Sequence, residues 1–337
     1  MLNKLTRHLS LLTAILLVSC AFSVRGHETI KPTDNFIIKN IPPVPASLVT
    51  ELERYTETRG AAPRSWHPKN RDLIITTRFG DTYQLHYLDH PGGARKQLTF
   101  FKEPVSSATF EPLNGDYFLF RRDAGGNEFA QIYRYDMKDG KVTLLTDGGR
   151  TQNGNIVWNK AKNKIAFAST KRNGADRDIY VMDPRDPSST KLLLEVKGGG
   201  WGIMDWSPDD TKMLIAEYKS INESNVHVLD IATGELTRVS PSSKKEQVSN
   251  PGGRFSKDGK YIWTVTDKGS EFRKLARMNA DGKDLKIITD DINWDVNGFD
   301  LHEDGEQMIF TANERGLNVA YLLDTKTLDS VSYTHLT

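Results

Sequence analysis

The sequence contains very little cysteine, because Cys20 is the only one among 337 residues. A single cysteine excludes an intrachain disulfide and any metal site built from several cysteines. The sequence also lacks an excess of charge of one sign, since 45 basic and 44 acidic side chains leave a net charge of +1. This balance gives no reason to expect a nucleic-acid partner.

Catalytic motifs are missing as well. A serine hydrolase of the α/β class needs a G-x-S-x-G pentapeptide, and the sequence has neither that motif nor alternating strands and helices. Gly198–Gly200 is not followed by the Gly-Lys-Ser/Thr of a phosphate-binding loop. His86 and His90 are predicted on a strand and its exit loop, where they would not converge on zinc. We therefore expect no catalytic residue, no metal site and no cofactor in this chain.

A long hydrophobic run occurs only at the N-terminus. Lys4 and Arg7 precede an apolar run over residues 9–18, which predicts a secretory signal over residues 1–26 and is too short for a confident membrane span. Residues 17–20 also resemble a bacterial lipobox, in which Cys20 would be lipidated. Cleavage without lipidation is the alternative. Either way we expect the chain to leave the cytosol for the periplasm, and to meet a membrane only through a lipid anchor.

The sequence does contain a unit of 44 to 49 residues that recurs six times. Each copy has an apolar anchor residue, a polar turn, an apolar strand, a second turn, a strand ending near Asp and a short last strand. The six anchors are Trp66, Phe110, Trp158, Trp206, Phe255 and Leu301. Four-stranded units that repeat at this period are typical of β-propeller blades.

We therefore predict an all-β fold, a β-propeller of four-stranded blades. The six blades are expected at residues 61–100, 105–147, 153–196, 201–240, 250–290 and 296–337. Six blades can close a ring, and they can equally be part of a ring of seven or eight. The second strand of each blade is so apolar that it needs cover on both faces, which neighbouring blades would provide. Trp66, Trp158 and Trp206 are expected in the core between blades.

The repeats also set the domain boundaries. A lead-in over residues 27–60 should contain a short helix with Ser47 as its N-cap, and we interpret this segment as a strap across the propeller or as a mobile linker. The propeller itself covers residues 61–330, and a tail follows at residues 331–337.

Propeller topology sorts the loops, if the strands of a blade are named A to D from the inside outwards. The connections between blades and the B–C hairpins share one face, and they are longer and more varied than the turns of the other face, as binding loops are. The most distinctive is the hairpin at residues 121–128, which carries charges around a Gly-Gly turn. Its candidate binding residues are Arg122, Asp123, Asn127 and Glu128. Either these charges satisfy one another, or a carboxylate attracts a positive group such as a peptide amine.

Three stretches carry a resemblance to a known family: residues 77–82, the Asp-Ala-Gly-Gly-Asn-Glu-Phe run at 123–129, and residues 178–184. They resemble the N-terminal propeller of secreted bacterial serine peptidases of the prolyl oligopeptidase family, of the acylaminoacyl- and dipeptidyl-peptidase type. The third stretch is also shared with TolB-like propellers. The resemblance extends from about Ile37 to Asp329.

This resemblance implies a peptidase in which an α/β-hydrolase domain with Ser, Asp and His follows the propeller. The propeller would admit only short or flexible peptides. In dipeptidyl peptidases, propeller glutamates hold the free amine of the substrate, which makes Glu128 a candidate for a comparable role. A peptide substrate and the hydrolase domain are thus the expected partners. The hydrolase domain is absent from this sequence, so we expect the chain to be inactive alone, and we interpret the tail as a truncation or as the last strand of blade six.

Two other interpretations stay open. The chain could be a self-contained, six-bladed, TolB-like binding module of the periplasm. It could also be a propeller enzyme such as a polysaccharide lyase, which needs clustered metal or base residues in the central channel. The innermost strands offer little of that kind beyond Asp205 and Asp300.

Overall fold

The computed structural model describes residues 28–32, 36–243 and 245–333. It consists of two compact units, the first ending at Gly60 and the second beginning at Ala61. The predicted signal segment with Cys20 lies outside the described residues, and so do the last four residues of the predicted tail. No helix in the described part of the chain is both long and apolar enough to cross a membrane.

The first unit contains helix α2 (Ala46–Thr56), close to the predicted position. The prediction of Ser47 as N-cap is wrong, because Pro45 occupies that position and makes no side-chain capping bond. Proline needs no helical hydrogen bond for its own nitrogen, so it fits the start of a helix. The apolar residues Leu48, Leu52 and Tyr55 are exposed, and no residue of α2 is buried.

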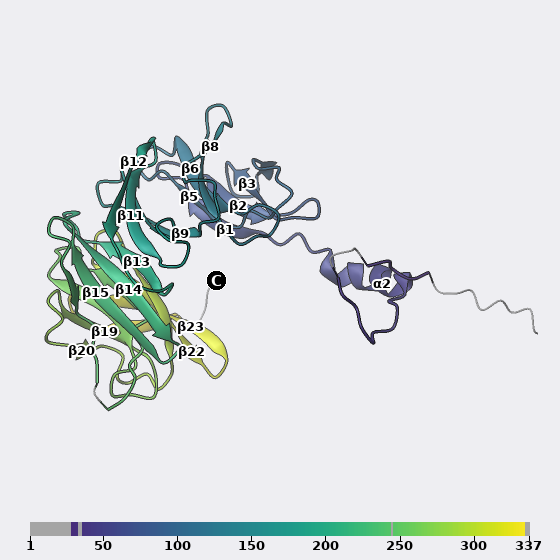
Figure 1. Ribbon diagram of the computed structural model, residues 1–337. Helices are drawn as coiled ribbons and strands as arrows, with labels where there is room; N and C mark the ends of the chain where they lie inside the picture. Colours follow the sequence, from purple (N-terminus) through teal and green to yellow (C-terminus); the bar gives the residue numbers. More distant parts are fainter. Residues whose placement is uncertain (1–27, 33–35, 244, 334–337) are drawn as a thin grey trace, which may run out of the picture. The chain divides into compact units, whose positions relative to one another are not determined.

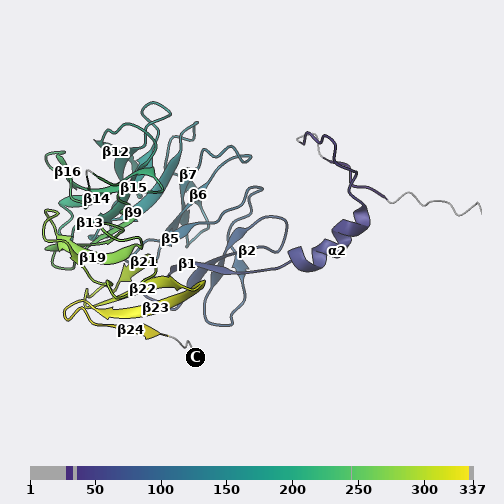
Figure 2. The ribbon, with the colours of Figure 1, turned by 90° about the horizontal axis from the view of Figure 1, so that it is seen from below.

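The second unit is a six-bladed β-propeller, which confirms the predicted fold class. Each blade is a four-stranded antiparallel sheet whose strands follow the order of the sequence. Figure 1 and Figure 2 show the six sheets following one another in sequence order, from the blue strands β1 and β2 to the yellow strands β22 and β23.

The strand bounds lie close to the predicted blade ranges. Blades 1 to 3 comprise β1 (Ala62–Trp66), β2 (Leu73–Thr77), β3 (Gln84–Leu88) and β4 (Lys96–Gln97); β5 (Ala108–Phe110), β6 (Tyr117–Arg122), β7 (Gln131–Asp136) and β8 (Val142–Leu144); β9 (Asn153–Trp158), β10 (Ile165–Ser169), β11 (Asp178–Asp183) and β12 (Asp186–Leu194). Blades 4 to 6 comprise β13 (Trp201–Trp206), β14 (Lys212–Ser220), β15 (Glu223–Asp230) and β16 (Leu236–Arg238); β17 (Gly252–Phe255), β18 (Tyr261–Thr266), β19 (Lys274–Asn279) and β20 (Lys286–Ile287); β21 (Val296–Leu301), β22 (Gln307–Glu314), β23 (Leu317–Asp324) and β24 (Ser330–Tyr333).

The second strand of a blade is apolar on both faces because it packs against two neighbours. In β10 all five residues are buried. Ile165 and Phe167 belong to a cluster shared with blade 2, whereas Ala166 and Ala168 belong to one shared with blade 4. Successive side chains of a strand point to opposite faces, so a run without polar residues serves both interfaces.

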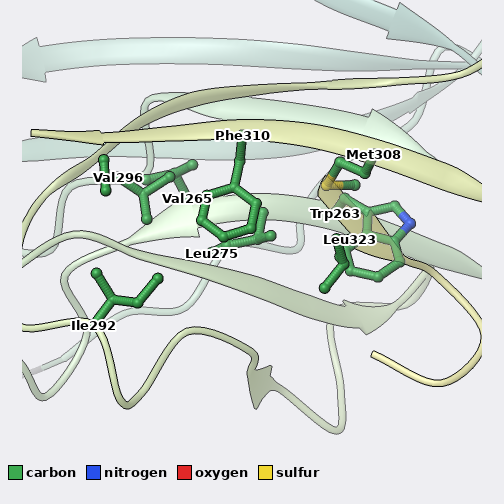
Figure 3. Close-up of a cluster of buried hydrophobic side chains, with 9 residues drawn as sticks. Trp263, Val265, Leu275, Ile292, Val296, Met308, Phe310 and Leu323 are labelled. Atoms are coloured by element: carbon green, nitrogen blue, oxygen red, sulfur yellow. The ribbon is translucent and has the colours of Figure 1, made fainter. Parts of the chain in front are cut away.

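Five such clusters make up the core, one for each pair of successive blades from 1–2 to 5–6. Figure 3 shows the cluster between blades 5 and 6, where Phe310 lies close to Val265 and Leu275. The predicted anchors Phe110, Trp206 and Phe255 are 2 to 5% exposed.

One anchor departs from the prediction of a core position between blades. Trp66 is 63% exposed and belongs to none of the five clusters. Trp206 is buried as predicted, and Trp158 packs against the cluster of blades 2 and 3. The physical reason is positional: an anchor packs against the preceding blade, and no described sheet precedes β1.

The A–B turns are built from short polar side chains. In the turn after Trp206, the Ser207 hydroxyl accepts a bond from the Lys212 amide at 2.9 Å and donates to the Asp209 carboxylate at 2.6 Å. The hydrogen bond from Ser207 and others from Thr211 lower the pKa of Asp209 to about 2. These local bonds replace the strand ladder where the chain reverses.

Candidate functional site

The B–C hairpins and the connections between blades contact each other, as expected for loops on one face. Glu103, in the connection from blade 1 to blade 2, binds Arg122 of the blade 2 hairpin at residues 121–128. The backbone N–H of Arg177, in the hairpin of blade 3, donates to the carbonyl of Gly198, in the next connection. We call this set of loops the loop face, and it holds all four predicted site residues.

The contacts of Arg122 hold the hairpin in place. Its Nη1 lies 2.9 Å from Oε2 of Glu103, and its guanidinium lies 4.3 Å from the Phe101 ring centre and 5.3 Å from that of Tyr133. The other carboxylate oxygen of Glu103 accepts the Gly125 amide at 2.9 Å. That backbone bond, followed by the bond from Arg122, keeps the pKa of Glu103 below its usual range.

Asp123 and Asn127 shape the hairpin from within. The Asp123 carboxylate accepts the amide of Glu128 at 2.9 Å, and the Asn127 side chain accepts the amide of Phe129 at 3.0 Å. These bonds hold Glu128 at a φ of 63°, in the left-handed region that most residues avoid. Glu128 itself is an exposed residue. The structure thus brings the four predicted residues together, with Asn127 and Glu128 exposed and Arg122 and Asp123 partly buried.

The corresponding hairpin of blade 3, at residues 171–178, has its charges satisfied internally. Arg172 binds the buried carboxylate of Asp178 through two bonds of 2.7 and 3.0 Å, and it also reaches Asp176 at 3.1 Å. Arg–carboxylate pairs with two parallel bonds are rigid and strong. For this hairpin the geometry therefore favours a structural role for most of its charges.

Two arginines of the loop face were missed by the sequence analysis. Arg121 has no carboxylate partner among the described residues, and Arg177 donates to the Gln152 side chain at 3.1 Å. Partial desolvation lowers the pKa of Arg121, and the neighbouring cation Arg177 lowers it further. The alternation of side chains along a strand could have identified Arg121, because adjacent residues of a strand point to opposite faces. If Arg122 lies on the face of β6 that contacts Glu103, Arg121 must lie on the opposite face of that strand.

Arg121 lies over the start of the innermost strand of blade 3. A Cβ atom at Gly154 would be only 2.6 Å from Nη1 of Arg121, so glycine is what allows the guanidinium to lie there. The next residue, Asn155, lines a cavity of about 450 Å³. The two arginines are therefore placed near the loop-face end of this cavity.

The cavity is formed by the innermost strands of blades 3 to 6, namely β9, β13, β17 and β21. Its wall carries main-chain groups, amides and the side chains of Met204, Arg254 and Phe299. Arg254 donates to the carbonyl of Met204 at 2.7 Å, which ties blade 5 to blade 4. A cavity of this size can hold part of a short peptide.

Among the described residues, no group of three or more His, Cys, Asp or Glu side chains converges on a metal site. Asp205 is buried and bound to Lys160 at 2.6 Å, whereas Asp300 is exposed. His86 is buried on β3, and His90 pairs with Asp89 at 2.6 Å.

Neither a protein-family model nor a curated protein sequence matches this chain. Among solved structures it is similar to a prolyl endopeptidase, with a TM-score of 0.64 and 11% identity over 82% of this chain and 43% of that one. It is also similar to the oligogalacturonate lyase of Vibrio parahaemolyticus, with a TM-score of 0.61 and 11% identity over 81% of this chain and 78% of that one. A putative TolB from Agrobacterium tumefaciens has a TM-score of 0.52 and 17% identity over 71% of this chain and 83% of that one.

Identities this low show the fold alone. Peptidases, a lyase and a TolB are all similar in fold to this chain, and function in such folds depends on the individual site. The chain spans less than half the length of the prolyl endopeptidase that it resembles.

Proposed function

We propose that this propeller is the substrate-gating domain of a secreted serine peptidase that acts on short peptides. An α/β-hydrolase domain would supply Ser, Asp and His, and the propeller would select the peptides that reach them. The proposal rests on one observation: the exposed residue Glu128 and the cations Arg121 and Arg177 lie on the same loop face, where Arg121 lies over Gly154, the residue before the cavity-lining Asn155. A short peptide with free ends carries the complementary amine and carboxylate.

Calorimetric titration with a short unstructured peptide tests this arrangement. We expect Glu128→Gln to weaken binding of the peptide with a free amine by about 3–10-fold, a factor typical of exposed charge pairs. We expect Arg121→Gln to weaken binding of the peptide with a free carboxylate by a similar factor. Matched controls are Glu271→Gln, an exposed loop carboxylate of blade 5, and Arg71→Gln, in an A–B turn. Affinities unchanged by acetylating one end and amidating the other would contradict the proposal.

The same proposal predicts that these 337 residues do not hydrolyse peptides. We expect no release of a fluorescent leaving group from acylated or dipeptidyl substrates above the rate in buffer. The reason is chemical, because acyl transfer needs an activated nucleophile and a stabilised oxyanion, and the sequence has no nucleophile elbow. Hydrolysis that copurifies with the homogeneous chain would overturn this expectation.

A TolB-like interaction module of the periplasm is the second candidate. The share of each solved structure that the chain matches favours this candidate, since the chain spans 83% of the Agrobacterium TolB structure and only 43% of the prolyl endopeptidase. This candidate predicts a monomer with one cooperative melting transition and no preference for peptides with free ends. Aggregation of the purified chain, or dependence of binding on both peptide termini, would favour the peptidase domain instead.

We also propose that the chain is exported and processed within residues 1–26. Mass spectrometry of the protein recovered from the periplasm of a bacterial host tests this, and an intact Met1 would contradict it. Incorporation of labelled fatty acid that disappears in Cys20→Ser would establish the lipidated form, whereas a soluble periplasmic product without label would establish plain cleavage.

A further inference from the structure

A second cavity lies at the end of the propeller opposite the loop face, and the proposed function does not use it. The A–B turns define this end, which we call the turn face, because successive connections of an antiparallel sheet alternate between its two ends. The cavity has a volume of about 430 Å³ and is lined by residues of blades 2 to 6. We call it the turn-face mouth.

Equivalent positions of the repeat form the rim of the turn-face mouth. In each of blades 2 to 6, the second residue after the anchor belongs to the lining. These residues are Pro112, Lys160, Pro208, Lys257 and Glu303. The chemistry of the rim is therefore set by which residue each blade has at this one position.

The turns themselves do not require lysine in the rim. Blades 1, 2 and 4 have proline two residues after the anchor, where its fixed φ suits a turn, whereas blades 3 and 5 have Lys160 and Lys257. Blade 3 adds Lys162 to the lining, at a φ of 62° in the left-handed region. Glycine adopts this conformation more readily, and blades 5 and 6 have Gly259 and Gly305 at the equivalent place. Local backbone geometry thus does not account for the lysines of the mouth.

Arg254 lies at the inner end of the turn-face mouth. It lines both this cavity and the one lined by Asn155, so it lies where the two cavities meet. Its Nη1 donates to the carbonyl of Met204 at 2.7 Å and to that of Gly253 at 3.1 Å, and these bonds hold the guanidinium in place. Nε and Nη2 of Arg254 donate to no residue that the structure describes. The guanidinium therefore keeps donors that can bind a carboxylate or a phosphate.

Two charged pairs in the lining are neutralised within the protein. Lys160 binds Asp205 at 2.6 Å, and the other carboxylate oxygen of Asp205 accepts the Phe255 amide. His302 lies 2.9 Å from the carboxylate of Asp304 in the same turn. These groups contribute little net charge to the turn-face mouth.

The remaining charges of the lining leave an excess of cations. Within the described parts of the chain, Lys162, Lys257 and Arg254 form no ion pair, and the exposed Glu303 is the only carboxylate of the lining besides Asp205. The half-buried apolar residue Trp158 belongs to the same wall. A cleft whose charges are mainly of one sign and whose walls are partly apolar concentrates the field of those charges and attracts counter-ions.

We infer that the turn-face mouth binds a small anion that carries two or more phosphate or carboxylate groups. Arg254 binds one of these groups with its free donors, while Lys162 of blade 3 and Lys257 of blade 5 bind the others. Cations contributed by two different blades favour an anion with several charged groups over one with a single charge. The inference does not depend on the proposed function, because the turn-face mouth lies opposite the loop face that carries Glu128.

Calorimetric titration of the 337-residue chain at low ionic strength tests this inference. The probes are inorganic tripolyphosphate and the tricarboxylate tricarballylate. We expect at least one of them to bind with one equivalent per chain, and the tighter of the two identifies the group that the mouth prefers. Acetate, which carries a single charge, should bind at least about 10-fold more weakly.

Variants of the rim locate the bound anion. We expect the double variant Lys162→Gln, Lys257→Gln to weaken binding by about 10-fold or more. The matched control is Lys164→Gln, Lys260→Gln, which removes two charges from the same two A–B turns at exposed positions outside the lining. Melting temperatures confirm that each variant folds.

A change at Glu303 should have the opposite sign. We expect Glu303→Gln to strengthen binding by about 2–5-fold, because it removes the carboxylate that repels an anion from the rim. A gain in affinity is an effect that damage to the fold would not produce. Glu306→Gln is the control, since this carboxylate of the same turn pairs with Lys326 at 2.6 Å and does not line the mouth.

Loss of anion binding in the double lysine variant, with unchanged affinity for the short peptide, would support a site separate from the loop face. Four results would overturn the inference. These are the absence of binding by both trivalent probes, equal weakening in the lysine variant and its control, acetate binding as tight as that of the trivalent probes, and weaker binding by Glu303→Gln.

Discussion

Asp205 joins three blades through one side chain. It lies on β13 of blade 4, with one carboxylate oxygen 2.6 Å from Nζ of Lys160 in blade 3 and the other 3.0 Å from the backbone nitrogen of Phe255 in blade 5. The carboxylate is 7% exposed. Removing it would leave the buried N–H of Phe255 without a partner, whereas water can reach Lys160, whose side chain is 42% exposed. An unpaired buried N–H costs more than the net gain of making such a bond.

We therefore expect Asp205→Ala to lower the free energy of unfolding by about 2–4 kcal/mol. The measurement is urea denaturation followed by tryptophan fluorescence. Asp300→Ala is the matched control at the equivalent position of blade 6, where we expect a change within about 0.5 kcal/mol because the side chain is exposed. Equal losses in the two variants would show that Asp205 does not act through its contacts with neighbouring blades.

We expect His227 to make the stability of the fold depend on pH. Burial lowers the pKa of His227, and this effect exceeds the opposing influence of Glu217, which lies 3.1 Å from Nε2. Arg238 and Lys219 lower the pKa of His227 further, and the Trp201 ring packs on the imidazole at 5.4 Å between ring centres. A histidine whose pKa is lower in the folded than in the unfolded chain favours the folded state above its unfolded pKa of ~6.5, and this contribution is lost as pH falls through the folded pKa.

Accordingly, we expect the melting temperature to fall between about pH 7 and about pH 5, and to fall less steeply in His227→Gln. The variant should keep part of the acid sensitivity, because burial also lowers the pKa of His86. His302→Gln is the control: the Asp304 carboxylate raises the pKa of this exposed histidine, so its small contribution is lost as pH rises. Superimposable pH profiles of His227→Gln and the parent chain would rule out the role given to His227.

The hairpin between β6 and β7 depends on the connection that precedes β5. Glu103 of that connection binds both Arg122 and the Gly125 amide, and Arg122 is also held against two aromatic rings. The turn itself contains Gly125 and Gly126 at φ values of 64° and 71°, so it has little intrinsic preference for one conformation. Glu103 therefore supplies part of its order from outside, in addition to the bonds that Asp123 and Asn127 make within the hairpin.

We expect Glu103→Ala to speed amide hydrogen exchange at Gly125 and its neighbours by about 10-fold, because the hairpin then opens locally more often. Hydrogen exchange followed by mass spectrometry measures this for the peptide that covers the hairpin. Glu195→Ala is the control, since its carboxylate is 64% exposed and lies 3.8 Å from Arg172 in the neighbouring blade. Unchanged exchange in the hairpin would mean that its own hydrogen bonds are sufficient.

The whole propeller is stabilised by repetition of one interface. Each of the five clusters combines the second strand of one blade with that of the next, so the blades are mutually dependent and a single blade could not bury its faces alone. The face of blade 6 that carries Ile309, which is 50% exposed, and Trp66 of blade 1 are the two ends of this series. An uncovered apolar sheet face of this kind also promotes association between molecules.

The equivalent positions Leu214 and Ile309 should therefore respond differently to the same change. We expect Leu214→Asp to lose at least about 4 kcal/mol or to prevent folding, because it buries an unpaired carboxylate between blades 4 and 5. Ile309→Asp should change the stability of the 337-residue chain by less than about 1 kcal/mol and reduce its tendency to aggregate. Urea denaturation and light scattering measure the two effects. A comparably large loss at Ile309 would show that blade 6 is covered in this chain.

The repeats predicted most of the architecture because they reflect local rules. Alternating apolar strands, Asp-Gly turns and anchors spaced by 44 to 49 residues specify a four-stranded unit without any knowledge of distant contacts. The candidate hairpin could be located for the same reason. The different roles of its two arginines could not be predicted, because Arg121 and Arg122 are the same residue type. Only the structure shows that Arg122 binds Glu103 and that Arg121 lies over Gly154.

The amino-acid sequence alone specified the all-β class, the blade boundaries, the single cysteine and the absence of a nucleophile elbow. The arrangement of the blades in space decided which copies of a repeated residue are buried. Trp66 and Phe110 occupy equivalent places in the repeat, yet one is 63% exposed and the other 2%. Burial depends on whether a neighbouring sheet is present in space, and a repeat pattern describes each blade without describing its neighbour. The exposure of Ile309 on blade 6 follows from the same principle.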